Sequence, residues 1–182
     1  MIIVGVDPGL RATGYGVIDH DRTRLEFVTA GDIRPPTKDV LASRLKFLHD
    51  ALSQLISRYR ADTVVLEKLF THHAHVTTAA LMGHARGAAC LAARDHRLPL
   101  AEYPPTQVKK SLTGRGHATK DQVARMVGRW LGVSGADWSA DASDALALAI
   151  VHAHTLQHHQ HFAAERLMAS SRRGESMRVA GR

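Results

Sequence analysis

The stretch Ile2-Ile3-Val4-Gly5-Val6-Asp7-Pro8-Gly9 predicts the centre of the fold. Its apolar run is unbroken from Ile2 to Val6, which is typical of a strand buried on both faces of a sheet. Pro8 favours extended backbone at Asp7, and Gly9 permits a turn. We therefore expect Asp7 at the carboxyl end of a central strand, where α/β sheets build sites. An ordinary Asp-Pro-Gly turn is the alternative interpretation.

Patterns along the rest of the chain predict an α/β fold. Strands are expected over 14–19, 24–33, 63–67 and 98–103, the last at a sheet edge that tolerates Pro99. Helices are expected over 41–59, 77–94, 107–112, 119–131 and from about 139 to about 161. This order favours a five-stranded mixed sheet flanked by helices on both faces. The segment 77–94 is rich in Ala and Gly, so it packs closely against either its own core or the same helix of a second copy.

The length suits one domain, which we place at residues 1–161. Residues 162–182 carry five Arg and two Glu with little periodicity, and they are predicted to form a flexible basic tail. The single cysteine, Cys90, excludes an internal disulfide and is compatible with a reducing compartment. No apolar run reaches about 18 residues and no signal peptide precedes the first strand, so we expect a cytoplasmic protein with no membrane segment.

The charge balance favours an anionic partner. The chain has 24 Lys and Arg against 17 Asp and Glu, a formal net charge of +7. Nucleic acid is the favoured partner, because a membrane surface would require an amphipathic basic helix with bulky apolar residues.

Four acidic residues stand where they could converge. Glu67, like Asp7, ends an apolar strand, and Asp141 and Asp144 lie about one turn apart at the start of the last helix. The helix dipole alone would explain the last two. If all four meet, their mutual repulsion requires a hard cation such as Mg²⁺ or Mn²⁺, and two such ions can catalyse phosphodiester hydrolysis. In so basic a protein this indicates a nuclease.

The motifs closely resemble those of the RuvC family of bacterial Holliday-junction resolvases, in unbroken order from residue 1 to about residue 158. The resemblance is carried by IIVGVDPGLRATGYG (residues 2–16), VLEKLF (65–70), GHARG (83–87), Tyr103, QVK (107–109) and ADASDALA (140–147).

The resemblance implies a ribonuclease H-like fold and a homodimer that places paired symmetric nicks across four-way junction DNA in recombination and repair. It also implies divalent-metal catalysis by Asp7, Glu67, Asp141 and Asp144. Some members carry His at the third position, where this chain has Asp, and Asp137 is the nearby rival for that role. The RuvA and RuvB branch-migration proteins, and a preference for cutting beside thymines, are implied by the family alone.

Several residues are predicted to hold DNA. Phe70 follows Glu67 by three residues and could stack on an unpaired base, a role that the resemblance supports over a place in the core. Lys109 and Lys120 occupy basic positions that the family uses near the scissile phosphate. The remaining candidates for phosphate contact are Lys110 and Arg115, with Arg86, Arg11 and Lys68 as weaker ones.

Other functions remain open at this point. The same fold and metals could serve a ribonuclease H-like nuclease that acts on RNA–DNA hybrid or precursor RNA. An actin-like nucleotide-binding domain would need a second half that the chain has no room for, and a catalytically silent DNA-binding protein leaves the strand-ending acids unexplained. Histidines at 72, 73, 75, 154 and 158 raise a zinc hypothesis, but no Cys or Glu pattern completes a tetrahedral set.

Overall fold

The computed structural model describes residues 1–21, 24–68, 76–133 and 137–179, with the backbone alone at 76, 159–161 and 163–179. Five strands and five helices make up this part of the chain. In order they are β1 (Ile2–Asp7), β2 (Thr13–Asp21), β3 (Arg24–Ile33), α1 (Leu41–Tyr59), β4 (Thr63–Glu67), α2 (Val76–Asp95), β5 (Leu100–Tyr103), α3 (Pro105–Thr113), α4 (Lys120–Leu131) and α5 (Ala140–Val179).

The strands form one mixed sheet in the order β3-β2-β1-β4-β5. The first three strands form an antiparallel meander, and β4 and β5 run parallel to β1. The expected five-stranded mixed sheet is therefore correct, with β5 at its edge. That edge strand begins at Leu100, so Pro99 precedes it, and the Pro99 carbonyl accepts hydrogen bonds from the backbone of Val64 and the hydroxyl of Thr63.

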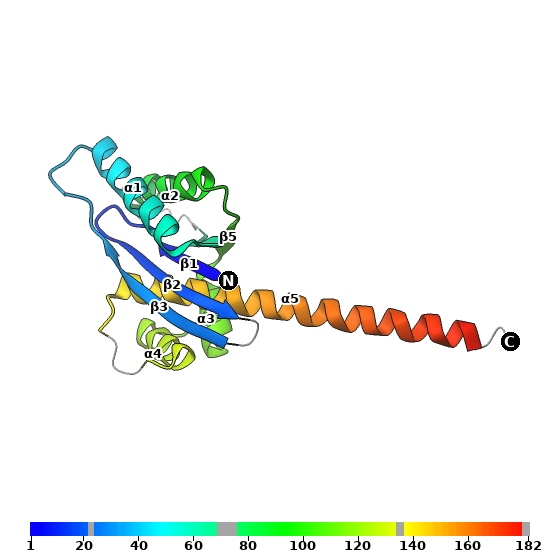
Figure 1. Cartoon of the computed structure of the whole chain (residues 1–182). Helices are drawn as coiled ribbons and strands as arrows, with labels where there is room; N and C mark the ends of the chain where they lie inside the picture. Colours follow the sequence, from blue (N-terminus) through cyan, green and yellow to red (C-terminus); the bar gives the residue numbers. More distant parts are fainter. Residues whose placement is uncertain (22–23, 69–75, 134–136, 180–182) are drawn as a thin grey trace.

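Helices cover both faces of the sheet (Figure 1). On one face α1 and α2 bury a cluster that includes Val4, Val6 and Leu66, and on the other α3, α4 and α5 bury one that includes Ile3 and Val65. Side chains of a strand alternate between the faces. Asp7 and Glu67 consequently point to the same face as Ile3 and Val65, the face that α5 covers.

The register brings those two acids together. Val6 of β1 pairs with Leu66 of the parallel strand β4, so Asp7 and Glu67 are the next residues of adjacent strands. Neighbouring strands lie about 4.8 Å apart. The two acids therefore end side by side at the carboxyl edge of the sheet.

Helix α5 lies directly on β1 and β2 because the strands present glycines to it. A methyl group on Gly5 would lie 1.9 Å from the Ala145 carbonyl oxygen, and one on Gly14 would lie 2.0 Å from that of Asp141. Since Gly14 pairs with Asp7, this contact brings the first turn of α5 beside the end of β1.

Hydrogen bonds from side chains define where two helices begin. The predicted capping box is present at α4, where the Thr119 hydroxyl accepts from the Gln122 amide and the Gln122 side chain accepts from the Thr119 amide. At α5 the Ser139 hydroxyl accepts a hydrogen bond from the Ala142 amide at 3.0 Å. The same hydroxyl donates at 2.6 Å to the carboxylate of Asp32, near the C-terminal end of β3. Ser139 therefore fixes the first turn of α5 to the sheet.

One expectation about the helices needs revision. The end predicted near residue 161 is wrong, because α5 continues to Val179 and projects away from the sheet (Figure 1). The division of the chain at that point stays a prediction. Helix α2 fits both earlier alternatives, since Ala85, Ala89 and Ala92 are buried against the core while Leu81 and Leu91 remain exposed.

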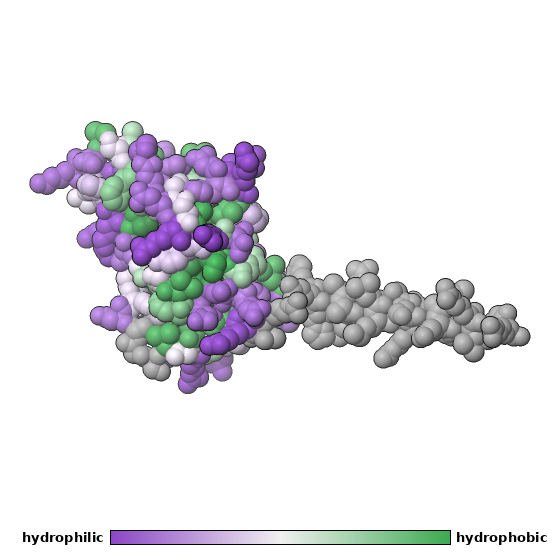
Figure 2. Space-filling model, in the orientation of Figure 1, coloured by the Kyte–Doolittle hydropathy of each residue, from purple (hydrophilic) through white to green (hydrophobic). Residues whose placement is uncertain are grey.

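The face of the molecule seen in Figure 2 is mainly polar. Figure 2 shows hydrophilic side chains over much of the visible face, with smaller apolar patches between them. Within the described ranges, none of the helices has the length and apolar character needed to span a bilayer.

Gly5→Ala should disrupt the fold. The added methyl would meet backbone of α5 that cannot move aside without displacing the helix, and overpacking of this kind typically costs about 1–3 kcal/mol or more. The matched control is Gly116→Ala, where the methyl meets only the Thr106 carbonyl oxygen at 3.8 Å. Urea unfolding should show a large loss of stability for the first variant and little change for the second. Equal stability of the two variants would contradict the close contact with α5.

Candidate active site

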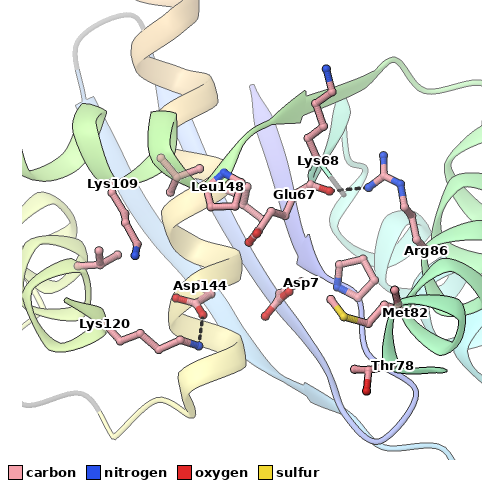
Figure 3. Close-up of a pocket in the computed structure, with 15 residues that line it drawn as sticks. Asp7, Glu67, Lys68, Thr78, Met82, Arg86, Lys109, Lys120, Asp144 and Leu148 are labelled. Carbon is pink, nitrogen blue, oxygen red and sulfur yellow. Dashed lines mark hydrogen bonds and ion pairs between the residues drawn. The ribbon is translucent and has the colours of Figure 1, made fainter. Parts of the chain in front are cut away.

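A cleft of about 500 Å³ opens where β1, β4 and α5 meet (Figure 3). Three carboxylates line it, those of Asp7, Glu67 and Asp144. The other lining residues are the basic Lys68, Arg86, Lys109 and Lys120, the polar Thr78 and the apolar Pro8, Ala79, Met82, Pro105, Val108, Val123 and Leu148. The cleft thus combines acids at its base with cations and apolar side chains around them.

Asp7 is the most perturbed of the acids. Burial and, after it, the negative charges of Asp144, Glu67 and Asp141 together raise its pKa from 3.8 to about 7, although Lys120 acts to lower it. A carboxyl group with such a pKa is partly protonated at neutral pH. A cation that binds beside it would displace the proton and compensate the repulsion.

Glu67 is perturbed in the same direction. Burial is the main cause of its raised pKa, followed by Asp144, whereas Lys120 and Lys109 act to lower the pKa. Lys109 of α3 and Lys120 of α4 therefore act electrostatically on the same acid from two different helices.

Lys120 forms an ion pair across the cleft. Its Nζ donates to Asp144 Oδ2 at 2.9 Å, and this hydrogen bond raises the pKa of the lysine (Figure 3). The ammonium group is mostly exposed, so the pair can separate at little cost. Lys120 thereby neutralises part of the charge that the carboxylates share.

Asp141 lies near this group without lining the cleft. It contributes to the raised pKa values of Asp7 and Lys120, which places its charge close to both. Its rival Asp137 is exposed in the loop before α5. The structure thus brings Asp141 to the acidic cluster and leaves Asp137 at the surface.

The other predicted residues fall into three groups. Lys109 and Lys120 line the cleft, with Lys68. Lys110 and Arg115 are exposed outside it, on α3 and the loop that follows. Phe70 and the histidines at 72, 73 and 75 lie outside the described residues.

Arg86 has partners other than the expected phosphate. Its guanidinium donates to the Glu67 carbonyl oxygen at 2.6 Å and forms an ion pair with Glu102. The side chain is only 14% exposed. These contacts are internal to the protein.

The donor set fits a hard divalent cation, because it offers carboxylate oxygens whose charge is poorly compensated. Across the described ranges, however, no three side chains of Asp, Glu, His or Cys stand close enough to share one ion. Since Lys120 occupies Asp144, ion binding would require that pair to separate and the carboxylates to turn inward. The same finding gives no support to zinc at His154 and His158.

Sequence reasoning missed the residues that support the acids. Arg44 of α1 donates to the Leu10 carbonyl oxygen at 2.7 Å, and the Thr13 hydroxyl bonds Gly9, so the loop after Asp7 is held from two sides. Ser139 was also missed, although a serine just before an Ala-rich helix is a typical N-cap. For Arg44 no local pattern indicates the contact.

Asp7→Asn should stabilise the metal-free protein. Because the pKa of Asp7 is raised from 3.8 to about 7, the folded state holds its proton more tightly than the unfolded state. Stability is therefore lost as the pH rises through this window, and the amide removes that loss, on the order of 4 kcal/mol above pH 7.

Thermal unfolding in EDTA measures this effect. The variant should exceed wild type in Tm at pH 8 and approach it near pH 4, whereas the exposed Asp137→Asn control should follow wild type at both. A difference between Asp7→Asn and wild type that did not change with pH would contradict the raised pKa.

Solved structures share this fold. The Thermus thermophilus RuvC structure aligns with a TM-score of 0.77 at 31% identity and covers 84% of this chain and 93% of that one. T. thermophilus RuvC in complex with a Holliday junction substrate gives 0.80 at 30% identity, covering 86% and 95%. A yeast mitochondrial Holliday junction resolvase, at 11% identity and a TM-score of 0.60, shows the fold alone. The expected ribonuclease H-like fold is confirmed.

Sequence comparison agrees with the structural one. The Alkaliphilus oremlandii crossover junction endodeoxyribonuclease RuvC is 43% identical over 155 residues, 85% of this chain and 94% of that protein. The Bordetella avium relative of the same name is 42% identical over 182 residues, 100% of this chain and 98% of that protein. A family model described as crossover junction endodeoxyribonuclease RuvC matches residues 3–152. The chain therefore belongs to the RuvC family of crossover junction endodeoxyribonucleases.

Proposed function

We propose that this chain resolves four-way DNA junctions by paired symmetric nicks, using divalent cations held by Asp7, Glu67, Asp141 and Asp144. Membership of the family makes it a hydrolytic nuclease. The observation that carries the finer proposal is the cleft, in which acids from β1, β4 and α5 face lysines from α3 and α4. A related structure from T. thermophilus was solved with a Holliday junction substrate, which supports the choice of DNA.

The four carboxylates would hold two ions, Mg²⁺ or Mn²⁺. Two such ions, when bound, polarise the scissile phosphate, lower the pKa of the attacking water and stabilise the leaving oxygen. The protein's part is to supply oxygen ligands at the ends of two strands and one helix. The raised pKa of Asp7 supports this role, because a carboxylate that repels its neighbours gains most from a cation.

Lys120 and Lys109 would bind the DNA phosphates beside the acids. In the free protein Lys120 pairs with Asp144, which holds its ammonium group at the cleft. From there the ammonium group would neutralise charge that develops on the phosphate. Lys109 is already directed toward the same space (Figure 3).

Lys110 and Arg115 would extend the phosphate contacts beyond the cleft. Both are exposed near the cleft-lining Lys109, and the net charge of +7 favours binding of a polyanion. Binding should weaken steeply with salt, because each phosphate contact releases counterions. Stacking of Phe70 on an unpaired base at the crossover stays a prediction.

A homodimer would supply the second nick. The exposed face of α2 carries the apolar Leu81 and Leu91 with Gly87 between them, and Leu91 is 60% exposed. Two copies of such a helix can approach closely about a two-fold axis. Assembly with RuvA and RuvB, and action in the cytoplasm, follow from the family alone and stay predictions.

Leu91→Glu should dissociate the dimer. The charge would be buried against the second copy at large cost, so light scattering should give a monomer and the junction should receive uncoupled single nicks. Trp130→Glu, also an exposed apolar site but on α4, is the control and should remain dimeric. A dimeric Leu91→Glu protein would place the interface elsewhere.

Cleavage of labelled DNA tests the main proposal. With Mg²⁺ or Mn²⁺ the protein should nick a four-way junction symmetrically and leave linear duplex and RNA–DNA hybrid intact. Asp7→Asn and Asp141→Asn should bind the junction without cutting it, whereas Asp137→Asn should cut normally, because that carboxylate is exposed outside the cluster.

Two outcomes would count against the proposal. Cleavage of the hybrid with no cutting of the junction would favour the alternative ribonuclease H-like nuclease. Loss of cutting in Asp137→Asn, with retention in Asp141→Asn, would reassign the third acid.

A further inference from the structure

The guanidinium of Arg86 joins three elements at the point where Glu67 leaves the sheet. It projects from α2, donates through Nη1 to the Glu67 carbonyl oxygen at 2.6 Å, and forms an ion pair through Nη2 with Glu102 of β5. Figure 3 shows it approaching Glu67 from the side opposite Asp144. The contact is therefore to the backbone of a predicted metal ligand and leaves its carboxylate facing the cleft.

This backbone needs an external support. The last β1–β4 pair is Val6 with Leu66, so Glu67 stands one residue beyond the ladder on that side. On the other side the Lys68 amide donates to the Tyr103 carbonyl at 2.9 Å, which fixes one end of the peptide that links Glu67 to Lys68. Arg86 binds the carbonyl of that same peptide. Together the two bonds fix the peptide plane, and with it the direction in which the Glu67 side chain leaves the backbone.

We propose that Arg86 is a positioning residue that orients Glu67 for metal binding, with Glu102 as its anchor. Arginine suits this task because its rigid, planar fork binds a carboxylate and a carbonyl at once, whereas lysine offers a single point charge. Glu102 pairs with Leu66 in the β4–β5 register, directly before Glu67. The pair holds the guanidinium plane in place. Arg86 thus acts through Glu67, in place of the phosphate contact expected from the sequence.

The placement of Arg86 also connects Glu67 to α2. One face of that helix is exposed and is the face proposed to contact the second copy. Along the sequence of the helix, Arg86 stands between Leu81 and Leu91, which belong to this exposed face. Formation of the dimer would therefore steady the helix that holds the Glu67 peptide. This inference rests on the proposed metal site.

Three variants test the role of Arg86. Arg86→Gln removes the fork, Arg86→Lys keeps the charge without the fork, and Glu102→Gln weakens the anchor while the arginine stays. The control is Arg58→Gln, an exposed arginine of α1 near the opposite end of β4. Loss of a partner that orients a metal ligand typically weakens metal binding by about 10- to 100-fold. We expect that loss for Arg86→Gln, smaller losses for the other two variants and none for the control.

The readouts separate positioning from other roles. Calorimetric titration with Mn²⁺ measures metal affinity without cleavage, and the Mg²⁺ concentration for half-maximal cutting should rise in parallel. Junction affinity in EDTA should be unchanged. Weaker junction binding, with a salt slope reduced by about 1 and normal Mn²⁺ affinity, would overturn the proposal in favour of a phosphate contact.

Two further outcomes are decisive. A lower Tm with normal Mn²⁺ affinity in all three variants would show that the contacts serve stability only, which also overturns the proposal. If wild type binds Mn²⁺ but cuts no junction, the proposed function fails, yet the Mn²⁺ titrations still establish or refute the positioning role.

Discussion

The acidic cluster depends on the direct contact between the backbone of α5 and the strands β1 and β2. Where a side chain on Gly5 or Gly14 would stand, the carbonyl oxygens of Ala145 and Asp141 lie instead. Only glycine allows backbone to approach this closely. Any larger residue would move α5 outward and carry Asp144 away from Asp7. The position of α5 thus depends on the absence of side chains at these two glycines, and the spacing of the carboxylates follows from that position.

Bringing these carboxylates together opposes stability in the metal-free protein. Asp7 is partly buried beside other acids, and the fold keeps it there with its pKa raised to about 7. Lys120 relieves part of the repulsion through Asp144, and Lys109 lowers the pKa of Glu67. The site therefore resembles many metal centres, in which the ligands destabilise the protein until the ions bind and binding energy becomes folding energy.

The sequence predicted the features that depend on local patterns. Asp7 and Glu67 could be found because each is the single charged residue that ends an apolar strand. The spacing of Thr119 and Gln122 likewise predicts the capping box of α4. The sequence could not predict the partners of Arg86, because an arginine is equally suited to bind a DNA phosphate at the surface and a backbone carbonyl inside the protein. The end of α5 was missed for another reason: residues beyond 161 show little amphipathic periodicity, the signal from which helix length is read.

Bonds from three different elements support three of the acids. Arg44 of α1 binds the loop after Asp7, Arg86 of α2 binds the Glu67 carbonyl, and Ser139 ties the turn that carries Asp141 to Asp32 of β3. The supports for Asp7 and Glu67 come from the helices on one face of the sheet, although both side chains point to the other face. Local unfolding of α1 or α2 would therefore disorder Asp7 or Glu67 at the opposite face, because the groups that orient these two acids lie across the sheet from their carboxylates.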